Sequence, residues 1–466
     1  MKHLHSVLAG VLLVGAHAGA QAPRCYDFRP VDALMNGTVS SLRLRGASLS
    51  LEKEGVRLYH KAFGGYTLGK VVPIASASKW IAGVLVMSQV DDGRIRLDDP
   101  LSKWFGSLPG EMGKATIRQC MSHTAGFDGW HPAISNRRLT LAQAAAQITK
   151  TPLRYKPGSS FHYGGVSMQM VGRVLELASK KDLETLLRER ILKPMGITTI
   201  DFQGLGKTKN YRMAAGMRAS LDDYATVLRM ILNGGMHGNR RILSRAAIQE
   251  MLRDQTNGAV IRYTPQPDSR RYGIGVWRDR IDARGTILQA SSQGAFGFSP
   301  WIDFERNVVG VFLVVNLIRR VAGPVNTLQA WTRAKLDPAG VLCFGRGSRS
   351  CSGTIATHAS GIPTSGLVSF ALTSSKAPPH TGGALLISAI GRTKGLPLLG
   401  AELWVGLSPA LLLPSVTDNL GNARVAVPLA ISRDTRLYTQ FAWLSTASCG
   451  KLGQLATSWG LELRVQ

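Results

Sequence analysis

The sequence lacks the motifs that mark metal-dependent and membrane-spanning proteins. Its 466 residues contain no HExxH and no pair of CxxC motifs, the spacings at which zinc ligands usually occur. We therefore expect no metal and no other cofactor. After the N-terminus, the longest apolar run is 396–416, which Glu402, Pro409 and Pro414 interrupt. A membrane span needs roughly 20 uninterrupted apolar residues, so no transmembrane helix is expected.

Acidic residues are also scarce. There are 29 Asp and Glu against 56 Lys and Arg, which gives a net charge of +27. Residues 341–466 contribute only +6, so the remaining +21 belongs to residues 1–340. Such a charge attracts an anionic cell-wall or membrane surface, although it also serves plain solubility. No nucleic-acid-binding motif accompanies it, so no nucleic acid is expected, and the sequence does not indicate an oligomeric state.

The first 22 residues have the pattern of a cleaved signal peptide. A short basic start precedes an apolar run at about 7–16, and small residues at 18–22 offer two cleavage sites. The alternative, an N-terminal membrane anchor, needs a longer apolar run. We therefore expect a secreted or periplasmic protein.

Export would bring the cysteines into an oxidising compartment, where their odd number leaves at least one unpaired inside the chain. Cys343 and Cys351 are the most local candidate pair. Cys120 lies in the apolar stretch IRQCM, which favours a buried thiol over a reactive one. The five are Cys25, Cys120, Cys343, Cys351 and Cys449.

The apolar pattern predicts an α+β domain over residues 23–340. Residues 41–72 alternate apolar and polar around an EKEG turn, which predicts a hairpin. Helical spacing follows, and strand-like runs return near the end of the domain. This order predicts a sheet assembled from the two ends of the domain. Helices are expected at 141–149, 167–180, 183–192 and 221–233, and later strands at 271–277, 286–294 and 308–316.

The composition changes to Gly, Ser, Thr and Pro after about residue 340. We interpret residues 341–351 as a linker. Six short strand-like runs without helical spacing follow, which predicts an all-β sandwich over residues 352–466. A passive spacer role for this sandwich is as well supported as ligand binding or surface anchoring. The runs are LVSFALT, ALLISAI, ELWVGL, ARVAVPL, LYTQFAWL and LELRV.

Ser76 and Lys79 form an SxxK motif at the start of a segment with helical apolar spacing. Residues three apart in a helix are neighbours, so the Ser76 hydroxyl and the Lys79 amine would meet. Burial lowers the pKa of a lysine, and a neutral amine can accept the serine proton. A second SxxK, from Ser50 to Lys53, lies in the predicted hairpin, where residues three apart point to opposite faces. We therefore take only Ser76 as a candidate nucleophile.

Several blocks around this motif resemble, in order and spacing, the serine β-lactamase and penicillin-binding-protein family. They run from IASASKWIAG through ATIRQCMSHTAGF, KPGSSFHYGG and RERILKPMGI to GMRASLDDYATVL. The branch that they resemble most contains class C β-lactamases and family VIII carboxylesterases. The resemblance covers about residues 26–335 and implies an antiparallel sheet flanked by helices, with a helical subdomain.

The resemblance also implies the roles of individual residues. Ser76 matches the acylated nucleophile and Lys79 the lysine of the same motif. Tyr163, in FHYGG, matches a tyrosine that assists proton transfer as tyrosinate or as a shuttle, and a tyrosinate needs a cationic neighbour such as Lys79. Ser292-Gln293-Gly294 matches the third motif, which lines the substrate site. The N–H groups of Ser76 and Ala295 would form the oxyanion hole.

Two departures from the family pattern bear on the substrate. Gly165 stands where β-lactamases have an asparagine, and Ser292 stands where the third motif has a cation. Both argue against an efficient β-lactamase or carboxypeptidase and favour a neutral ester or amide, although an arginine elsewhere could replace the missing cation. Gly294 would let the substrate approach closely, and Trp301 is a candidate for lining an acyl pocket. His123 is expected to be buried and hydrogen-bonded.

We therefore interpret the chain as a secreted serine hydrolase that acts through an acyl-enzyme on ester or amide substrates. One alternative is a β-lactamase or a D-Ala-D-Ala-type peptidase, which would act on β-lactams or cell-wall peptides. Another is a non-catalytic penicillin-binding-like module, and a third is a surface adhesin whose main function resides in the C-terminal sandwich.

Overall fold

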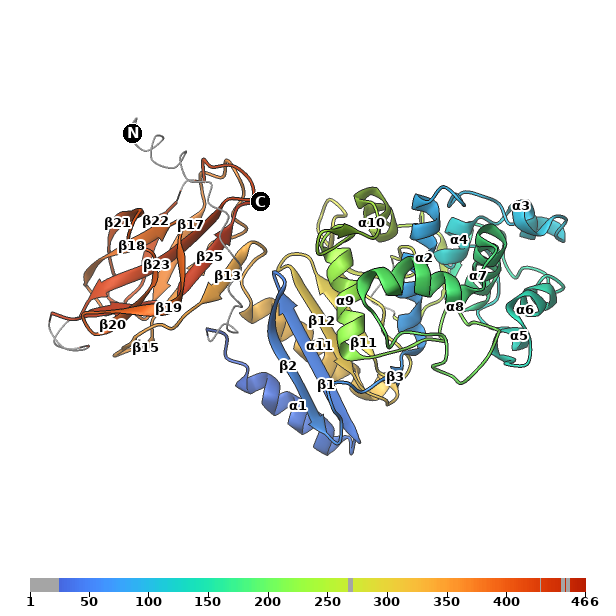
Figure 1. Cartoon of the computed structure of the whole chain (residues 1–466), viewed down its shortest axis with the longest axis horizontal. Helices are drawn as coiled ribbons and strands as arrows, with labels where there is room; N and C mark the ends of the chain where they lie inside the picture. Colours follow the sequence, from blue (N-terminus) through green and yellow to red (C-terminus); the bar gives the residue numbers. More distant parts are fainter. Residues whose placement is uncertain (1–24, 267–270, 428, 446–448, 450–452) are drawn as a thin grey trace. The chain divides into compact units, whose positions relative to one another are not determined.

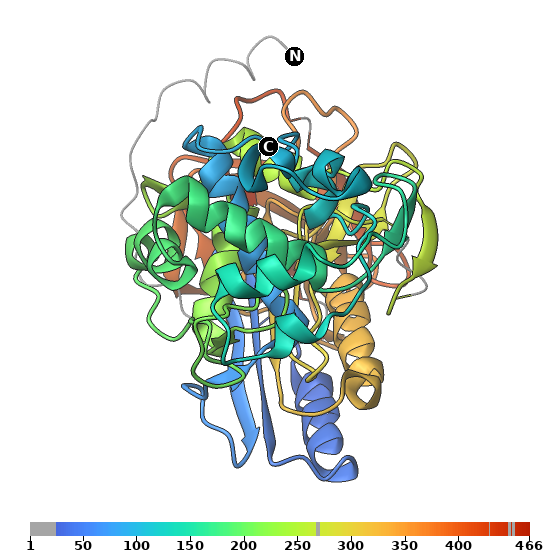
Figure 2. The same ribbon diagram turned by 90° about the vertical axis from the view of Figure 1, so that its right-hand side faces the viewer.

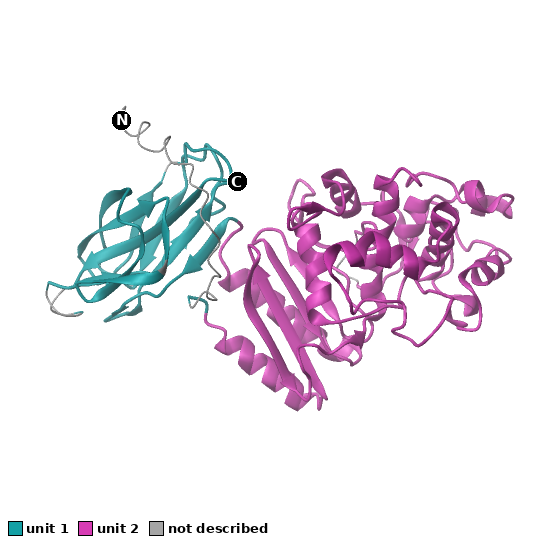
Figure 3. Cartoon of the chain, in the orientation of Figure 1, with its two compact units in different colours: residues 1–26, 340–466 teal, residues 27–339 magenta. Residues whose placement is uncertain are grey.

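The structure, a computed structural model, describes residues 25–266, 271–427, 429–445, 449 and 453–466. The expected signal peptide, residues 1–22, lies outside the described residues. Figure 3 shows two compact units, one of residues 27–339 and a second that comprises Cys25, Tyr26 and residues 340–466. Within the described ranges, no helix is long and apolar enough to cross a membrane.

A six-stranded antiparallel sheet forms the centre of the unit of residues 27–339 (Figure 1). Strand β1 from the start of the unit pairs with β12 from its end, with Leu49 opposite Phe312. The sheet therefore joins the two ends of the domain, as the sequence predicted. In spatial order its strands are β2 (Val56–Gly64), β1 (Gly46–Lys53), β12 (Val308–Leu313), β11 (Ser299–Asp303), β10 (Ile287–Ser291) and β9 (Trp277–Ile281).

The two faces of this sheet are buried against different helices. On one face, α1 and α11 lie side by side and enclose a cluster that contains Trp301 (Figure 2). On the other face, α2 and α9 belong to a larger cluster that contains Ile302. Successive strand residues point to opposite faces, which explains why these two neighbours are separated. The four helices are α1 (Arg29–Ser41), α2 (Ser78–Asp91), α9 (Leu221–Leu232) and α11 (Ile318–Lys335).

A helical subdomain packs around α2. All four predicted helical stretches are confirmed to within about two residues, although α8 continues as a π-helical turn (Arg188–Leu192). Its helices are α3 (Ser102–Phe105), α4 (Ile117–Met121), α5 (Pro132–Ser135), α6 (Leu141–Ile148), α7 (Val166–Ser179), α8 (Leu183–Leu187) and α10 (Arg245–Leu252). Short strand pairs join β3 (Val72–Pro73) to β5 (Arg218–Ala219), β4 (Ser160–His162) to β8 (Val260–Tyr263) and β6 (Met236–His237) to β7 (Arg240–Arg241).

The predicted strand at 271–277 is wrong in position, because β9 begins only at its last residue. The preceding residues pass directly against α2 instead of joining the sheet. A Cβ atom on Gly275 would lie 2.2 Å from the carbonyl oxygen of Lys79, and one on Gly83 would lie 2.3 Å from that of Ile274. Glycine at both positions permits this close approach between backbones.

Residues 340–466 form the predicted β-sandwich. A sheet of order β13-β25-β23-β18-β21, with β24 beside β23, shares an apolar core with the three-stranded sheet β16-β17-β22. The six predicted runs correspond to β17, β18, β20, β22, β23 and β25. The strands are β13 (Val341–Phe344), β14 (Arg349–Ser350), β15 (Gly353–Thr354), β16 (Ala356–Ala359), β17 (Ala371–Ser375), β18 (Gly382–Ser388), β19 (Gly391–Leu398), β20 (Ala401–Val405), β21 (Ala410–Val416), β22 (Ala423–Ala426), β23 (Arg436–Leu444), β24 (Leu455–Thr457) and β25 (Gly460–Arg464).

The interpretation of residues 341–351 as a linker is wrong. This segment begins with β13, which pairs with β25 inside the larger sheet, with Val341 opposite Leu463. Val341 is fully buried in the core of the sandwich. The unit that contains residues 340–466, called the β-unit below, therefore includes this segment. The Gly and Ser content of residues 341–351 had suggested a linker.

The disulfides join Cys25 to Cys343 and Cys351 to Cys449, so the predicted pairing of Cys343 with Cys351 is wrong. The bonded cysteines are 318 and 98 positions apart in the sequence. Proximity in the sequence did not predict the cysteine pairing, because the folding of the β-unit brings distant segments together. Cys120 is free and buried, as the sequence predicted.

Candidate active site

Ser76 and Lys79 meet at the start of α2. Residues 75–77 form a 3₁₀ turn that leads into the helix. Lys79 Nζ lies 3.2 Å from Ser76 Oγ and donates a 2.8 Å hydrogen bond to the carbonyl oxygen of Ala214. Lys79 is only 2% exposed, whereas Ser76 is partly exposed. The structure thus places a hydroxyl that a substrate can reach beside a buried amine.

The second SxxK copy has a different geometry. Ser50 and Lys53 lie on β1, and both are buried. Lys53 Nζ donates hydrogen bonds of 2.7 and 2.9 Å to the carbonyl oxygens of Arg306 and Pro338. This lysine therefore ties β1 to later segments of the chain and does not belong to the site at Ser76.

The start of α2 is held by the segment that surrounds Met217. The Met217 N–H donates to Ser78 Oγ at 3.0 Å, and its carbonyl oxygen accepts from the Ile74 N–H at 3.0 Å. From α9, the Tyr224 hydroxyl donates to the carbonyl oxygen of Ala77 at 2.7 Å. Twelve of the fourteen residues of α2 are buried. The nucleophile therefore sits on a rigid element, as precise catalytic geometry requires.

Tyr163 follows β4 directly, and its ring is enclosed by other rings and by Lys79. The Ser76 side chain lies near the tyrosine hydroxyl, where it counteracts part of the rise in the pKa of Tyr163 that burial causes. The distances to the Tyr163 ring centroid are 4.6 Å from Lys79 Nζ, 4.6 Å from the His123 ring, 5.2 Å from the stacked Trp277 ring and 6.2 Å from the edge-on Tyr272 ring. The structure therefore brings together all three predicted catalytic side chains.

The electrostatics of this cluster favour proton transfer to Lys79. Burial and, to a smaller extent, the positive charge of Arg212 lower the pKa of Lys79 to about 7. A large fraction of its amine is therefore neutral at pH 7 and able to accept the Ser76 proton. Burial raises the pKa of Tyr163 to about 12, so it remains a neutral phenol. These values favour the shuttle alternative for Tyr163 over the tyrosinate.

Ser292, Gln293 and Gly294 follow the end of β10 and pack against the turn that carries the nucleophile. Ser292 Oγ donates a 3.2 Å hydrogen bond to the carbonyl oxygen of Ser76, and Gln293 is half-buried. A Cβ atom on Gly294 would lie 2.1 Å from the carbonyl oxygen of Ile74. Glycine is therefore required by contact with the chain itself, whereas the sequence suggested contact with the substrate.

Ala295 follows this segment and is exposed. Its carbonyl oxygen accepts a 3.0 Å hydrogen bond from the Ile318 N–H, but its own N–H has no hydrogen-bond acceptor among the described residues. Ser76 lies in the first turn of a helix, where N–H groups have no partner inside the helix. The use of the Ser76 and Ala295 N–H groups as an oxyanion hole, which the resemblance implied, stays a prediction.

Gly165 lies at the start of α7, with φ −115°. A Cβ atom at this position would lie 3.3 Å from Ile134 Cδ1 and 3.4 Å from the Cβ atom of Ala214. The backbone does not require a glycine here, and the neighbours leave room for a small adjustment. Because residue 165 is a glycine, no side chain extends from this position towards Ala214, the residue whose carbonyl oxygen binds Lys79.

Two expectations for aromatic residues need correction. Trp301 does not line an acyl pocket, because it is fully buried on the α1 and α11 face of the sheet, where its ring packs on Gly310. His123 is buried as expected, but neither of its ring nitrogens has a hydrogen-bond partner among the described residues. Burial holds the pKa of His123 well below its usual value, so the ring that contacts Tyr163 is neutral.

Residues outside the recognised motifs complete the site. The sequence interpretation missed Ala214, which contacts Lys79, Tyr272, which packs against Tyr163, and Arg212, whose charge acts on Lys79. The local signal was weak: Ala214 lies two residues before the recognised block GMRASLDDYATVL. Over the described ranges, no group of three or more His, Cys, Asp or Glu side chains is arranged to hold a metal ion.

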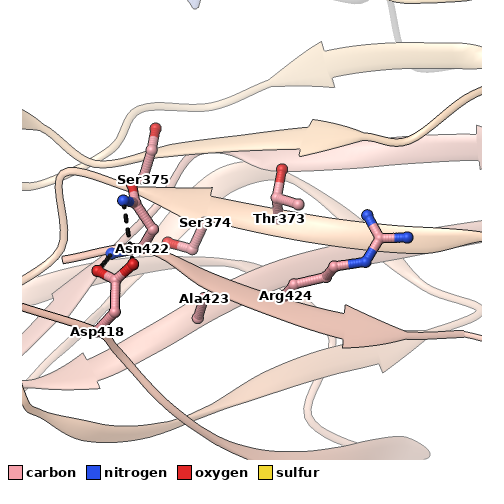
Figure 4. Close-up of a pocket in the computed structure, with 7 residues that line it drawn as sticks. All are labelled: Thr373, Ser374, Ser375, Asp418, Asn422, Ala423 and Arg424. Carbon is pink, nitrogen blue, oxygen red and sulfur yellow. Dashed lines mark hydrogen bonds between the residues drawn. The ribbon is translucent and has the colours of Figure 1, made fainter. Parts of the chain in front are cut away.

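The β-unit contains a pocket of about 370 Å³, which is lined by residues of β17, of β22 and of the turn that precedes β22 (Figure 4). The Asp418 carboxylate at its edge accepts the N–H groups of Leu420 and Asn422 at 2.9 and 2.7 Å, and so stabilises a turn. The lining contains no nucleophile beside a base. It consists of Thr373, Ser374, Ser375, Asp418, Asn422, Ala423 and Arg424.

Comparison with known proteins places this geometry in a family. Residues 31–322, well over half of the chain, match the Beta-lactamase family. The solved structure of a candidate β-lactamase from Bacteroides dorei is 32% identical, with a TM-score of 0.58, and the match covers 62% of this chain and 91% of that one. The D-amino acid amidase from Ochrobactrum anthropi shares the fold at 19% identity and a TM-score of 0.54, over 64% of this chain and 99% of that one.

Curated relatives match over shorter spans. Protein flp from Staphylococcus aureus is 23% identical over 188 residues, which is 37% of this chain. The match spans only 38% of the length of that protein. The family match, in contrast, contains every predicted catalytic residue and nearly the whole unit of residues 27–339. The chain therefore belongs to the beta-lactamase family.

Proposed function

We propose that this chain is an exported serine hydrolase that cleaves esters or amides through an acyl-enzyme. The observation that carries the proposal is the 3.2 Å contact between Ser76 Oγ and the buried amine of Lys79, whose pKa is about 7. A serine hydroxyl becomes an effective nucleophile when a neighbouring base accepts its proton. Lys79 supplies that base at neutral pH.

Acylation follows from the positions of these groups. Ser76 Oγ attacks the carbonyl carbon of the substrate while its proton passes to the neutral Lys79 amine. The carbonyl oxygen becomes an oxyanion, which the N–H groups of Ser76 and Ala295 stabilise. When the tetrahedral intermediate collapses, the bond to the leaving group breaks. The leaving group takes a proton from the Tyr163 hydroxyl, which is restored by the Lys79 ammonium.

Deacylation repeats these steps with water. A water molecule gives its proton to Lys79, directly or through Tyr163, and attacks the acyl carbon. The second tetrahedral intermediate collapses, and Ser76 Oγ leaves as it recovers its proton. The products are a carboxylic acid and the free enzyme, and no cofactor is consumed.

The departures at Gly165 and Ser292 support an esterase-like hydrolase over an efficient β-lactamase. Position 165 offers no side-chain amide, and the Ser292 hydroxyl binds the carbonyl oxygen of Ser76. The Ochrobactrum enzyme is named as an amidase, which supports amides as a substrate class for this fold. The alternatives are hydrolysis of β-lactams or D-Ala-D-Ala-type peptides, and binding without catalysis.

Export and a surface partner belong to the same proposal. Two disulfides suit an oxidising compartment and so support the signal peptide expected at residues 1–22. The net charge of +27 supports contact with an anionic cell-wall or membrane surface. The β-sandwich is proposed to act as a spacer or as an anchor to that surface.

Active-site labelling and turnover test the proposal together. The mature protein should react with a fluorophosphonate probe and hydrolyse a chromogenic short-acyl ester, with little turnover of a chromogenic cephalosporin. Ser76→Ala should lose both labelling and ester turnover. Ser50→Ala is the matched control, because it removes the serine of the other SxxK motif, whose Oγ has no hydrogen-bond partner among the described residues.

Each outcome separates the candidate functions. Full ester turnover in Ser76→Ala would refute the mechanism. Rapid cephalosporin turnover, or a stable adduct of a labelled penicillin at Ser76, would favour the β-lactam or cell-wall peptide alternative. An unlabelled Ser76 without turnover would favour the binding module.

A further inference from the structure

The exposed apolar side chains of the unit of residues 27–339 are concentrated on a few segments. Among the described residues of this unit, large apolar side chains are exposed only at Trp130, on β8 and in the segment that follows β12. Single exposed apolar residues are ordinary, whereas several that border one site indicate a binding surface. We call these six residues the apolar rim. They are Trp130, Val260, Ile261, Tyr263, Val315 and Leu317, which are between 38 and 63% exposed.

Trp130 and β8 border the segment that carries Tyr163. The Tyr163 N–H donates a 3.1 Å hydrogen bond to the carbonyl oxygen of Tyr263, the last residue of β8. The carbonyl oxygen of Gly129, directly before Trp130, accepts the Gly165 N–H at 2.9 Å. Among the described strands β8 pairs only with β4, and all of its residues are exposed. This part of the apolar rim is therefore bonded to the backbone at Tyr163 and two residues beyond it.

The rest of the apolar rim borders the segment that carries Ala295. The residue between Val315 and Leu317 donates its N–H to the carbonyl oxygen of Phe296 at 3.0 Å. The next N–H along the chain after Leu317, that of Ile318, donates to the carbonyl oxygen of Ala295 at 3.0 Å. The exposed apolar side chains thus lie on segments bonded to the chain beside two groups of the candidate active site, the Tyr163 hydroxyl and the Ala295 N–H.

Arginines accompany these apolar side chains. Arg262 lies within β8, Arg319 and Arg320 end the segment 315–320, and all three are exposed. Residues 259–263 and 315–320 contain no Asp or Glu. The interface of an anionic bilayer complements both kinds of side chain, because its acyl region takes up apolar groups and its phosphates attract arginine. Tryptophan and tyrosine are also enriched at this interface.

We propose that the apolar rim and its arginines dock the unit of residues 27–339 onto an anionic lipid bilayer, so that the candidate active site faces the lipid. The net charge of +27 attracts the protein to such a surface, and the rim makes the close contact. A soluble anionic polymer would leave the apolar side chains in water. The substrates are then esters or amides of amphiphilic molecules held in the bilayer, a step that rests on the proposed hydrolase function.

Vesicle sedimentation tests the docking without turnover. The Ser76→Ala protein should bind vesicles of three parts phosphatidylcholine to one part phosphatidylglycerol, and bind pure phosphatidylcholine more weakly. Adding Arg262→Gln and Arg319→Gln should weaken binding to the anionic vesicles roughly 25-fold, because each arginine near such a surface contributes about fivefold. Adding Ile261→Ser and Leu317→Ser instead should weaken it roughly tenfold or more, because these side chains are then no longer transferred from water.

Two matched controls remove side chains of the same kinds outside the apolar rim. Arg240 is an exposed arginine on β7, and Leu412 on β21 is 58% exposed. Arg240→Gln and Leu412→Ser, each in Ser76→Ala, should leave vesicle binding unchanged. Circular dichroism checks that every variant is folded. Weaker binding in Leu412→Ser, with unchanged binding in the rim variants, would overturn the inference.

Turnover of 4-nitrophenyl palmitate held in vesicles tests the substrate step. The wild-type rate should be higher in the anionic vesicles than in pure phosphatidylcholine, and Arg262→Gln/Arg319→Gln should bring the ratio of the two rates close to one. A rim that only contacts the acyl chain of the substrate would affect both rates equally, so its effect cancels in the ratio.

The two experiments fail separately. Vesicle binding without hydrolysis would refute the proposed function and the substrate step but support the docking. Equal vesicle binding with and without the rim substitutions would overturn the inference. Binding that depends on Arg262 and Arg319 but not on Ile261 and Leu317 would also overturn it, because a purely electrostatic contact needs no bilayer.

Discussion

Replacement of Lys79 by methionine should abolish activity and stabilise the folded protein in a pH-dependent way. The lysine is 2% exposed, and its polar partners are a carbonyl oxygen and a hydroxyl. Folding must therefore desolvate an ammonium or remove its proton. Methionine is of similar length and carries no charge, so it avoids that cost while it removes the base.

The size of the effect follows from the two pKa values. The pKa of Lys79 is about 7 in the folded protein and 10.5 without the fold. Between these values the unfolded chain binds more protons, so stability rises with pH across this window and is lowest below pH 7. At about 1.4 kcal/mol per pKa unit, burial of Lys79 costs about 4 to 5 kcal/mol at pH 6 but only about 2 kcal/mol at pH 9. The stabilisation by Lys79→Met should therefore be about 2 to 3 kcal/mol larger at pH 6 than at pH 9.

Urea unfolding of the wild type and Lys79→Met at both pH values measures this difference. Comparison of one variant between two pH values cancels the change in packing, which does not titrate. Lys150→Met, at an exposed lysine, should show no such difference. In the wild type, kcat/KM for an ester should rise with pH through about 7, because the neutral amine is the active form. A stability difference that does not depend on pH would refute the assignment of Lys79 as a buried, largely neutral base.

Three further substitutions test the rest of the site. Gly294→Ala places a Cβ atom 2.1 Å from the carbonyl oxygen of Ile74, so the loop that carries the Ala295 N–H must move. The value of kcat should therefore fall roughly 100-fold, the effect of losing an oxyanion donor. An unchanged kcat would exclude this loop from catalysis. Gly165→Asn restores an amide and should raise cephalosporin turnover about five- to tenfold, the value of one hydrogen bond, and no increase would show that another feature limits the reaction. Trp301→Phe, at the ring that packs on Gly310, should lower the free energy of unfolding by about 1 to 3 kcal/mol without changing KM for the ester. A raised KM would instead support the expectation that Trp301 lines the acyl pocket.

The parts of the molecule that the sequence predicted well depend on local geometry. Ser76 and Lys79 are one helical turn apart, so their contact needs little beyond the helix itself. The same spacing at Ser50 and Lys53 lies on a strand, and the alternating pattern of the hairpin was enough to separate the two cases. Tyr163 is distant in sequence, and it was found because its motif resembles that of a known family.

The parts that the sequence did not predict depend on contacts between distant segments. The charge of Arg212 acts on Lys79 because the segment around Met217, which follows Arg212, is bonded to the start of α2. Trp301 was misplaced because β11 is buried on both faces, so no alternation of polar and apolar residues shows which face a side chain joins. The strand at 271–277 was misplaced because the close approach of Gly275 to α2 leaves no signal in apolar spacing.

The burial of α2 on all sides has a consequence for the evolution of this protein. Backbone amides at the centre of such a helix exchange with deuterium only when the whole unit opens, so nearly every substitution in α2 is selected first for folding. In the other segments of the site, positions 165, 212 and 293 are only partly buried and so are less restricted. New specificity in descendants of this chain should therefore arise at positions such as 165, 212 and 293, while α2, the helix that carries Lys79, changes slowly.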